Sequence, residues 1–191
     1  IFSNNISISF KPIVEVIVKS SPTAFPVNVS SLLAIIPVMI LPDFNNSVFI
    51  NVKIDGSTGY YCAGMNKKAS IQVNGSVGPG VAENMMSGKV VVENNAGSCF
   101  GAALRGGDLI VKGDAGARTG IDMKGGTILI GGNAGAYTGF MMQRGRIIVC
   151  GDVNANMGDS MYDGIIFVGG EPHSLGTDCV PGEMNEHEVR W

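Results

Sequence analysis

Histidine and clustered basic residues are scarce in this sequence of 191 residues, and their scarcity excludes several functions. The two histidines are His173 and His187. With 13 Lys and Arg against 16 Asp and Glu, the formal net charge is −3, and Lys and Arg form no run longer than two residues. A nucleic-acid partner is therefore not expected. With so few histidines, no Ser–His or Cys–His pair for nucleophilic catalysis can be drawn.

The short motifs of nucleotide, hydrolase and metal sites are also missing. The sequence has no Gly-x-Gly-x-x-Gly, no Gly-x-Ser-x-Gly, and no Walker motif, because Gly88-Lys89 is followed by Val90. Its four cysteines form no Cys-x-x-Cys pair: Cys62, Cys99, Cys150 and Cys179. We expect them to be small buried residues in a reducing cytosol, so the prediction is a cytoplasmic protein without cofactor, metal or disulfides.

Glycine is absent from residues 1–50, although the chain has 28 glycines, and this region holds five of the eight prolines. The change in composition predicts a boundary after residue 50, followed by a repeat domain over 51–170 and a cap or tail over 171–191. Within the first region, strands are expected at 13–18 and 27–29, and a short helix at 31–36. The apolar run 32–41 contains Pro37 and is too short to span a bilayer, and we expect no signal peptide and no membrane partner.

The region after residue 50 repeats one short apolar strand every 19 residues. The strands begin at seven equally spaced residues: Val52, Ile71, Val90, Leu109, Ile128, Ile147 and Ile166. A fixed period with one β-branched strand per unit is typical of a β-helix. A left-handed hexapeptide β-helix, the fold of acyltransferases, is excluded because 19 is not a multiple of six and the walk from Ile71 reaches Glu83. The prediction is an all-β, right-handed parallel β-helix of about seven coils.

Glycine recurs at the fifth, eighth and twelfth positions of the unit, where we expect sharp turns. These structural turn residues are Gly75, Gly78, Gly97, Gly101, Gly113, Gly116, Gly120, Gly132, Gly135, Gly139, Gly151 and Gly158. Glycine tolerates positive φ at no steric cost, and asparagine is the next most tolerant residue. Asn94 and Asn154 replace glycine in two of these columns, so both are predicted to have positive φ.

The side chains of each strand alternate between two faces. The first and third positions are always Val, Ile or Leu and are expected to line the bore. The fifteenth position, from the second coil on, should fill the bore from another side: Met85, Leu104, Met123, Met142 and Met161.

The second position should point outward, and it is apolar in the later coils. After Lys53 and Gln72 it reads Val91, Ile110, Leu129, Ile148 and Phe167. A contiguous apolar surface on a soluble protein usually marks a binding site. These five residues are the candidate interface, and the hypothesis is that they are covered by residues 1–50 or by a partner subunit.

The carboxylates show no arrangement that predicts catalysis. They occupy scattered turn positions: Glu83, Asp108, Asp114, Asp122, Asp152, Asp159 and Asp163. Residues 80–88 are the least repeat-like part of the second coil. Two interpretations stay open there: a partner or ligand contact at Glu83 and Asn84, or a hydrogen-bonded corner. No catalytic, cofactor-binding or metal-binding residue is expected.

Four strings resemble a known family. Residues 59–66 read Gly-Tyr-Tyr-Cys-Ala-Gly-Met-Asn, 78–88 read Gly-Pro-Gly-Val-Ala-Glu-Asn-Met-Met-Ser-Gly, 158–162 read Gly-Asp-Ser-Met-Tyr, and 174–179 read Ser-Leu-Gly-Thr-Asp-Cys. With the glycine rhythm, they resemble the Gly-x-Gly-x-Gly β-helix domain of glutamate synthase over residues 52–184. The strings look most similar to the free-standing subunit of N-methylglutamate synthase and related complexes.

The resemblance implies a non-catalytic structural subunit of a glutamate synthase-like complex. Its partners would be a glutamine-amidotransferase-like subunit and an FMN and iron–sulfur synthase subunit, which together make glutamate or N-methylglutamate. The same domain type also resembles the β-helix subunit of formylmethanofuran dehydrogenase, so membership of such a redox complex is the first alternative. A stand-alone β-helix enzyme is the second.

Overall fold

The computed structural model describes residues 13–19, 49–184 and 186. These residues form one eight-stranded parallel sheet in which the strands follow one another in sequence order. The strands are β1 (Ile13–Lys19), β2 (Phe49–Asp55), β3 (Lys67–Val73), β4 (Ser87–Val92), β5 (Asp108–Val111), β6 (Lys124–Ile130), β7 (Arg144–Val149) and β8 (Ile165–Val168).

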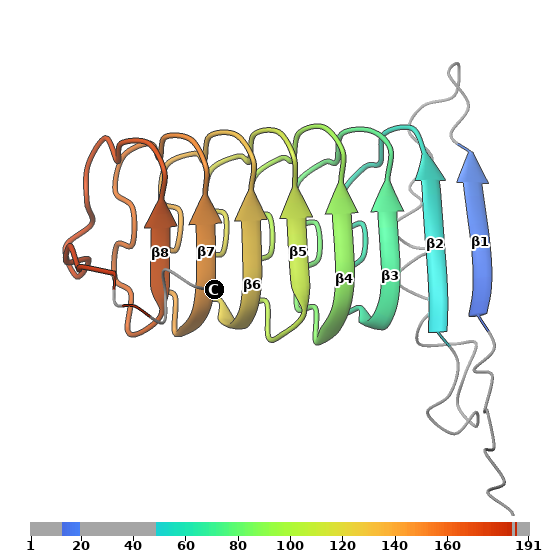
Figure 1. The fold of residues 1–191 in the computed structure, drawn as a ribbon, viewed down its shortest axis with the longest axis horizontal. Helices are drawn as coiled ribbons and strands as arrows, with labels where there is room; N and C mark the ends of the chain where they lie inside the picture. Colours follow the sequence, from blue (N-terminus) through green and yellow to red (C-terminus); the bar gives the residue numbers. More distant parts are fainter. Residues whose placement is uncertain (1–12, 20–48, 185, 187–191) are drawn as a thin grey trace, which may run out of the picture.

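From β2 on, each segment between two strands leads back to the start of the next strand, which makes this part of the chain a parallel β-helix (Figure 1). In Figure 1 the chain rises along each strand on the near side and descends behind it while it advances from β2 to β8. This path is right-handed, as parallel crossovers almost always are. Val52 pairs with Ile71 and Ile147 with Ile166, so the 19-residue spacing sets the register of the sheet. The predicted fold class is confirmed, with seven strands at this spacing and about six complete turns.

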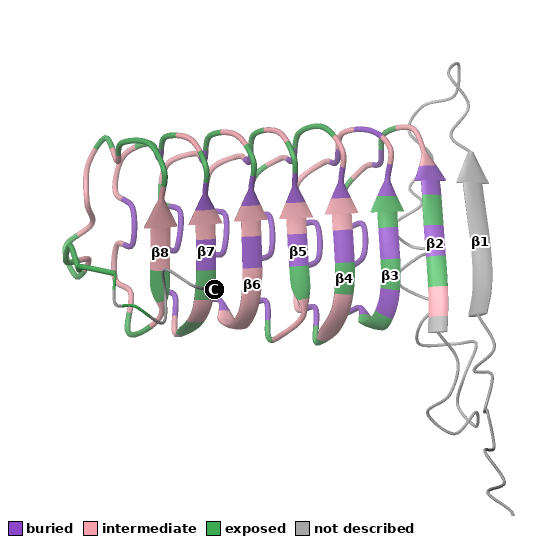
Figure 2. Cartoon of the chain, in the orientation of Figure 1, coloured by how far each residue is buried: buried purple, intermediate pink, exposed green. Residues whose placement is uncertain are grey.

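The bore is filled by the residues that the strand alternation assigned to it. The first and third positions of the 19-residue unit, which are Val52 and Ile54 in β2, are buried in every strand from β2 to β7. Figure 2 shows the resulting alternation along the arrows. Met85, Leu104, Met123 and Met142 are fully buried on the opposite wall. Each such side chain contributes roughly 1.5–3 kcal/mol of burial free energy. The coils are therefore held together mainly by apolar contacts within the bore.

A second ladder runs along the wall opposite the sheet. Its bridges join equivalent residues of successive coils, for example Thr58 with Val77 and Ala96 with Ala115. The chain then passes through a run in which the tenth, twelfth and fourteenth positions of each coil have φ between 51° and 75°, whether or not they are glycine. Hydrogen bonds between coils hold this run, since the Met65 N–H donates to the Glu83 carbonyl at 2.8 Å and that of Ala82 to the Cys62 carbonyl at 2.8 Å.

The expectation that Asn94 and Asn154 have positive φ is wrong. Neither residue has it, and neither do the glycines at the fifth and eighth positions beyond Gly56. Glycine occurs there for another reason: a Cβ at Gly116 would lie 2.6 Å from the Ser98 nitrogen of the preceding coil, and one at Gly135 2.4 Å from the Ala117 nitrogen. Close backbone approach therefore selects glycine at these corners. Only the twelfth position, which includes Gly101, Gly120, Gly139 and Gly158, has the positive φ that we expected.

Both ends of the β-helix depart from the repeat. At the first end, β1 pairs in parallel with β2, with Val16 opposite Val52. The strand predicted at 13–18 is thus confirmed, whereas the strand and helix predicted at 27–29 and 31–36 lie outside the described residues. At the other end, stacking continues beyond Gly170, because Pro172 pairs with Val153 and Leu175 with Met157, the latter at a spacing of 18 residues.

Candidate functional site

The predicted apolar stripe lies on the outer face of the sheet. Val91, Ile110, Leu129, Ile148 and Phe167 are strand partners in successive pairs, so they stack in one row from β4 to β8. All five are half-buried, because neighbours on the adjacent strands cover part of each side chain. Within each strand they lie between residues that point into the bore. The strand register behind the candidate interface is therefore correct.

The two halves of the stripe have different borders at the strand ends. Beside the first half, the Lys112 Nζ lies 2.6 Å from the Glu93 Oε2, and the Gln72 Nε2 donates to the Glu93 Oε1 at 3.2 Å. The hydrogen bond from Lys112 lowers the pKa of the Glu93 carboxyl, whose side chain is only partly exposed to solvent. Beside the second half, the equivalent positions are Gly131, an exposed Cys150 and Gly169, so no long side chain borders Leu129, Ile148 or Phe167 there.

The other border of the sheet carries a basic rim that the sequence order concealed. It consists of residues at the sixteenth, seventeenth and nineteenth positions of successive coils, just before or at the start of the strands: Lys67, Lys68, Lys89, Arg105, Lys124, Arg144 and Arg146. Of these, Lys124 forms an ion pair with Asp122 at 2.6 Å. Sorting charges by position in the 19-residue unit, rather than searching for runs of Lys and Arg, would have revealed this rim.

A polar ladder follows the sixth position of the coils along the opposite corner. At each level a side-chain oxygen accepts a hydrogen bond from the backbone N–H of the equivalent residue one coil later. The Asp114 N–H donates to the Asn95 Oδ1 at 2.9 Å, and the Asn133 N–H donates to the Asp114 Oδ1 at 2.7 Å. The ladder members are Ser57, Ser76, Asn95, Asp114, Asn133, Asp152 and Glu171. Asp114 and Asp152 thus share one column, contrary to the scattered arrangement that we expected, and their role here is structural.

Replacing Asn133 by alanine removes the acceptor for the Asp152 N–H, which is 2.9 Å from the Asn133 Oδ1. We expect the free energy of unfolding to fall by about 1 kcal/mol, the typical net worth of one hydrogen bond. Urea unfolding followed by circular dichroism measures this change. Asn133→Asp is the matched control, since it keeps the acceptor oxygen, and an equal loss in both variants would contradict the role assigned to the ladder.

The described carboxylates, histidine and cysteines form no metal-binding group of three or more ligands. Asp122 accepts hydrogen bonds from Lys124 and from Gln143, both at 2.6 Å, and Asp159 accepts the Thr177 N–H at 3.1 Å. Each of these carboxylates has a partner that stabilises the coil or its neighbour. Nothing in their placement assigns them to a reaction.

Glu83 and Asn84 lie on the wall opposite the sheet, in the second coil. The Asn84 N–H donates to the Ala102 carbonyl at 2.9 Å, and Asn84 has a φ of 55°. The Tyr61 ring lies against Gly80, where a Cβ would be 3.4 Å from the ring, and Gly80 itself has a φ of 75°. The segment follows the hydrogen-bond pattern of the other coils, and Gly80 leaves room beside the Tyr61 ring. Tyr60, Tyr61 and Met65 form an exposed apolar group on the same wall.

The four cysteines differ in exposure and none forms a disulfide. Cys62 is buried in the bore, and burial raises the pKa of its thiol, while the nearby Thr58 hydroxyl has the smaller, opposite effect. Cys179 is half-buried near the last coil, and burial raises the pKa of its thiol as well. Cys150 is exposed. Cys99 is half-buried as well, so the expectation that all four are buried is correct only for Cys62. Cys150 is the most exposed of the four because it follows the bore residue Val149 at the end of β7 and lies on the outer face.

We expect iodoacetamide to alkylate Cys150 at least tenfold faster than Cys62 in the native chain. The thiolate is the reactive species, and burial of Cys62 both blocks access and disfavours its charged form. Site-resolved mass spectrometry of a time course at pH 8 measures the two rates. In denaturant the rates should become similar, and native rates that are already equal would show that Cys62 is not in the bore.

No protein-family model matches the chain, and no curated protein is significantly similar to it. Among the described residues, no helix has the length and apolar character needed to cross a membrane.

Proposed function

We propose that the chain is a non-catalytic scaffold subunit of a glutamate synthase-like complex, which makes glutamate or N-methylglutamate. The strings at 59–66, 78–88, 158–162 and 174–179, which resemble the free-standing β-helix subunit of such complexes, support the assignment. The single structural observation that carries the scaffold role is the apolar stripe on the outer face of a regular β-helix.

The distribution of functional groups also favours a scaffold over an enzyme. In the described part of the chain, polar side chains such as those of Asn133 and Asp122 join one coil to the next. An enzyme needs a nucleophile, an acid or a base within reach of one substrate, and no such groups converge among these residues. The stripe, in contrast, offers what a subunit interface needs: contiguous apolar surface with charged residues at its border.

The partners in this proposal are a glutamine-amidotransferase-like subunit and an FMN and iron–sulfur synthase subunit. The described residues hold no cysteine cluster that would ligate an iron–sulfur cluster, so the cofactors would belong to the synthase subunit. The scaffold would hold the two enzymes in a fixed arrangement. Its repeat suits this task, because a stack of identical coils is a stiff rod with long, regular faces.

Purification of the tagged chain from its source cell, followed by cofactor analysis, tests the proposal. We expect the amidotransferase-like and flavin-containing subunits to co-elute, and FMN and iron to follow them. The chain purified alone should show neither flavin nor cluster absorbance after gel filtration, and no turnover with glutamine and 2-oxoglutarate. A pterin-containing partner would instead indicate a formylmethanofuran dehydrogenase-like complex, and turnover by the isolated chain would indicate an enzyme.

A further inference from the structure

The last strand of the β-helix has a free edge. β8 pairs with β7 on one side, and within the described residues no strand pairs with its other side. An unpaired edge presents a row of N–H and C=O groups that can bind another extended chain. The tail pairs with the preceding coil elsewhere, since Leu175 forms a bridge with Met157. The unpaired backbone groups are thus confined to the edge of the sheet.

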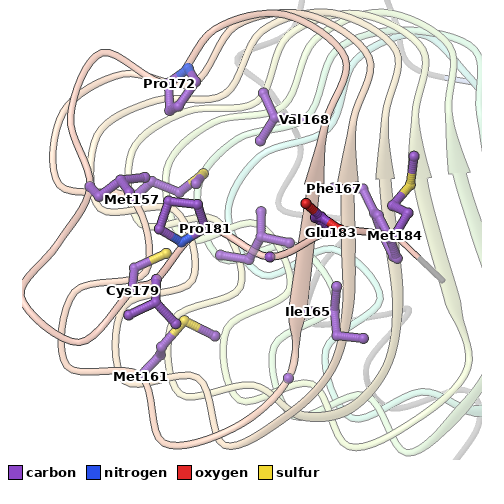
Figure 3. A pocket seen from close by; sticks show the side chains of 15 residues that line it. Met157, Met161, Ile165, Phe167, Val168, Pro172, Cys179, Pro181, Glu183 and Met184 are labelled. Atoms are coloured by element: carbon purple, nitrogen blue, oxygen red, sulfur yellow. The ribbon is translucent and has the colours of Figure 1, made fainter. Parts of the chain in front are cut away.

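A cavity of about 410 Å³ lies between this edge and the tail (Figure 3). It is lined mainly by apolar side chains, including Met157, Met161, Ile166, Leu175, Cys179 and Pro181. The bore residues Ile166 and Val168 are only half-buried, unlike their fully buried equivalents Ile147 and Val149 one coil earlier. The difference arises because no further coil covers them in the part of the chain that the structure describes. An apolar side chain entering the cavity would complete their burial.

Exposed apolar residues surround the opening. Tyr162 is 75% exposed, Ile165 39%, Val180 82% and Met184 61%, and all four lie on the last coil or the tail. Ile165, Val180 and Met184 line the cavity itself, as does Phe167, the last member of the stripe. The opening is therefore continuous with the candidate interface on the outer face of the sheet.

The charge at this end is mainly negative, although Arg146 of β7 is the strand partner of Ile165 at the start of β8. Residues 147–186 contain seven acidic residues and no Lys or Arg: Asp152, Asp159, Asp163, Glu171, Asp178, Glu183 and Glu186. Residues 51–146 contain ten basic and six acidic residues, a formal charge of +4, against −7 for 147–186. A partner that approaches this end is favoured by positive charge and disfavoured by negative charge.

We propose that the C-terminal end of the β-helix binds an extended segment of a partner subunit, which adds as a strand to the free edge of β8. Apolar side chains of this segment enter the cavity, and its Lys or Arg side chains lie beside Glu183 and the other acidic residues. Strand addition to an open edge obtains affinity from main-chain hydrogen bonds and specificity from pockets for alternate side chains. A second copy stacked head to tail would extend the contact into an open filament, and the test below treats that copy as a competing occupant.

This inference rests on the proposed function only in that a scaffold has partner subunits. The test uses the full chain and two synthetic peptides, one of alternating valine and lysine and one of alternating valine and glutamate. Alkylation of Cys179, which lines the cavity, reports occupancy, and Cys150 on the outer face of the β-helix, just after β7, is the internal control. We expect the valine–lysine peptide to slow alkylation of Cys179 at least threefold and to leave Cys150 unchanged.

The variant Glu183→Lys should weaken this protection about two- to fivefold, the range for one exposed ion pair. Glu83→Lys makes the same change of charge in the second coil and should leave the protection unchanged. An unchanged Cys179 rate at millimolar peptide, or equal protection by the valine–glutamate peptide, would overturn the proposal. So would protection that rises with the concentration of the chain alone, because that would identify a second copy as the occupant. These outcomes do not depend on which complex the chain belongs to.

Discussion

Replacing Val111 by glutamate should unfold the chain. Val111 is fully buried in the bore at the end of β5, and its equivalents Val92 and Ile130 lie directly on either side. The substitution loses roughly 1.5–3 kcal/mol of apolar burial. It also places a carboxylate in the bore without a partner, which costs about 3–5 kcal/mol. The sum is comparable to the whole stability of a typical domain, so far-UV circular dichroism should show no folded state at 25 °C.

Ile110→Glu is the matched control, one residue earlier on the same strand. The Ile110 side chain points outward, where a carboxylate reaches water, so we expect the free energy of unfolding to change by less than about 1 kcal/mol. If Ile110→Glu unfolds the chain and Val111→Glu does not, the strand register is wrong by one residue, because such a shift exchanges the two faces.

Replacing Gly135 by alanine should destabilise the chain by about 3 kcal/mol, the upper range for overpacking. The new Cβ would lie 2.4 Å from the Ala117 nitrogen and 2.6 Å from the Gly116 carbonyl carbon. Both atoms belong to the backbone of the preceding coil, so no side chain can move aside. The coils would have to separate, which weakens the hydrogen bond from the Gly135 N–H to the Ala115 carbonyl. Urea unfolding should show a lower midpoint with an unchanged slope.

Gly59→Ala tests whether this cost comes from the contact between coils. Gly59 occupies the same eighth position in the first coil, and a Cβ there would meet no atom within 4 Å. Its φ is not positive either, so alanine suits the backbone. We expect a change within about 0.5 kcal/mol. Equal losses in Gly59→Ala and Gly135→Ala would mean that local backbone conformation, rather than the preceding coil, selects glycine in this column.

The arrangement of the coils could be predicted from the sequence because two periods act together. The 19-residue repeat places Ile71 beside Val52 and Val90, and the two-residue alternation of a strand then assigns each column to the bore or the outside. Burial of Leu109 and Val111 and the outward position of Ile110 follow from these two rules alone. The stacking of columns also predicted that the fifteenth position, which includes Met123 and Met142, lies in the bore, and both side chains are fully buried.

The conformation of the turns could not be predicted in the same way. Glycine marks both positive φ and close backbone approach, and the sequence does not distinguish them. At Gly135 the cause is the preceding coil, whereas Tyr61 and Met65 have φ of 57° and 56° although neither is glycine. Hydrogen bonds between coils hold these residues in a conformation that costs about 1–2 kcal/mol in isolation. At these positions the hydrogen bonds between coils outweigh the local conformational preference of the residue.

The candidate site was predicted in part. The stripe followed from the alternation, but the basic rim depends on residues 19 or more positions apart, such as Lys89 and Arg146, that only the coiled fold brings onto one border. The cavity at β8 depends on the path of the tail, which has no period to fix it. Pairing of β1 with β2 likewise joins residues 36 positions apart, outside the repeat.

The most direct test of the scaffold account is the binding of partner subunits to the double variant Ile110→Glu, Ile148→Glu. Both side chains lie in the stripe, so the variant should keep the circular dichroism spectrum and unfolding midpoint of the parent chain. The account predicts that the amidotransferase-like and flavin-containing subunits will co-elute with the parent chain and will not co-elute with the variant. The result that would contradict it is a folded variant that retains both subunits with unchanged affinity.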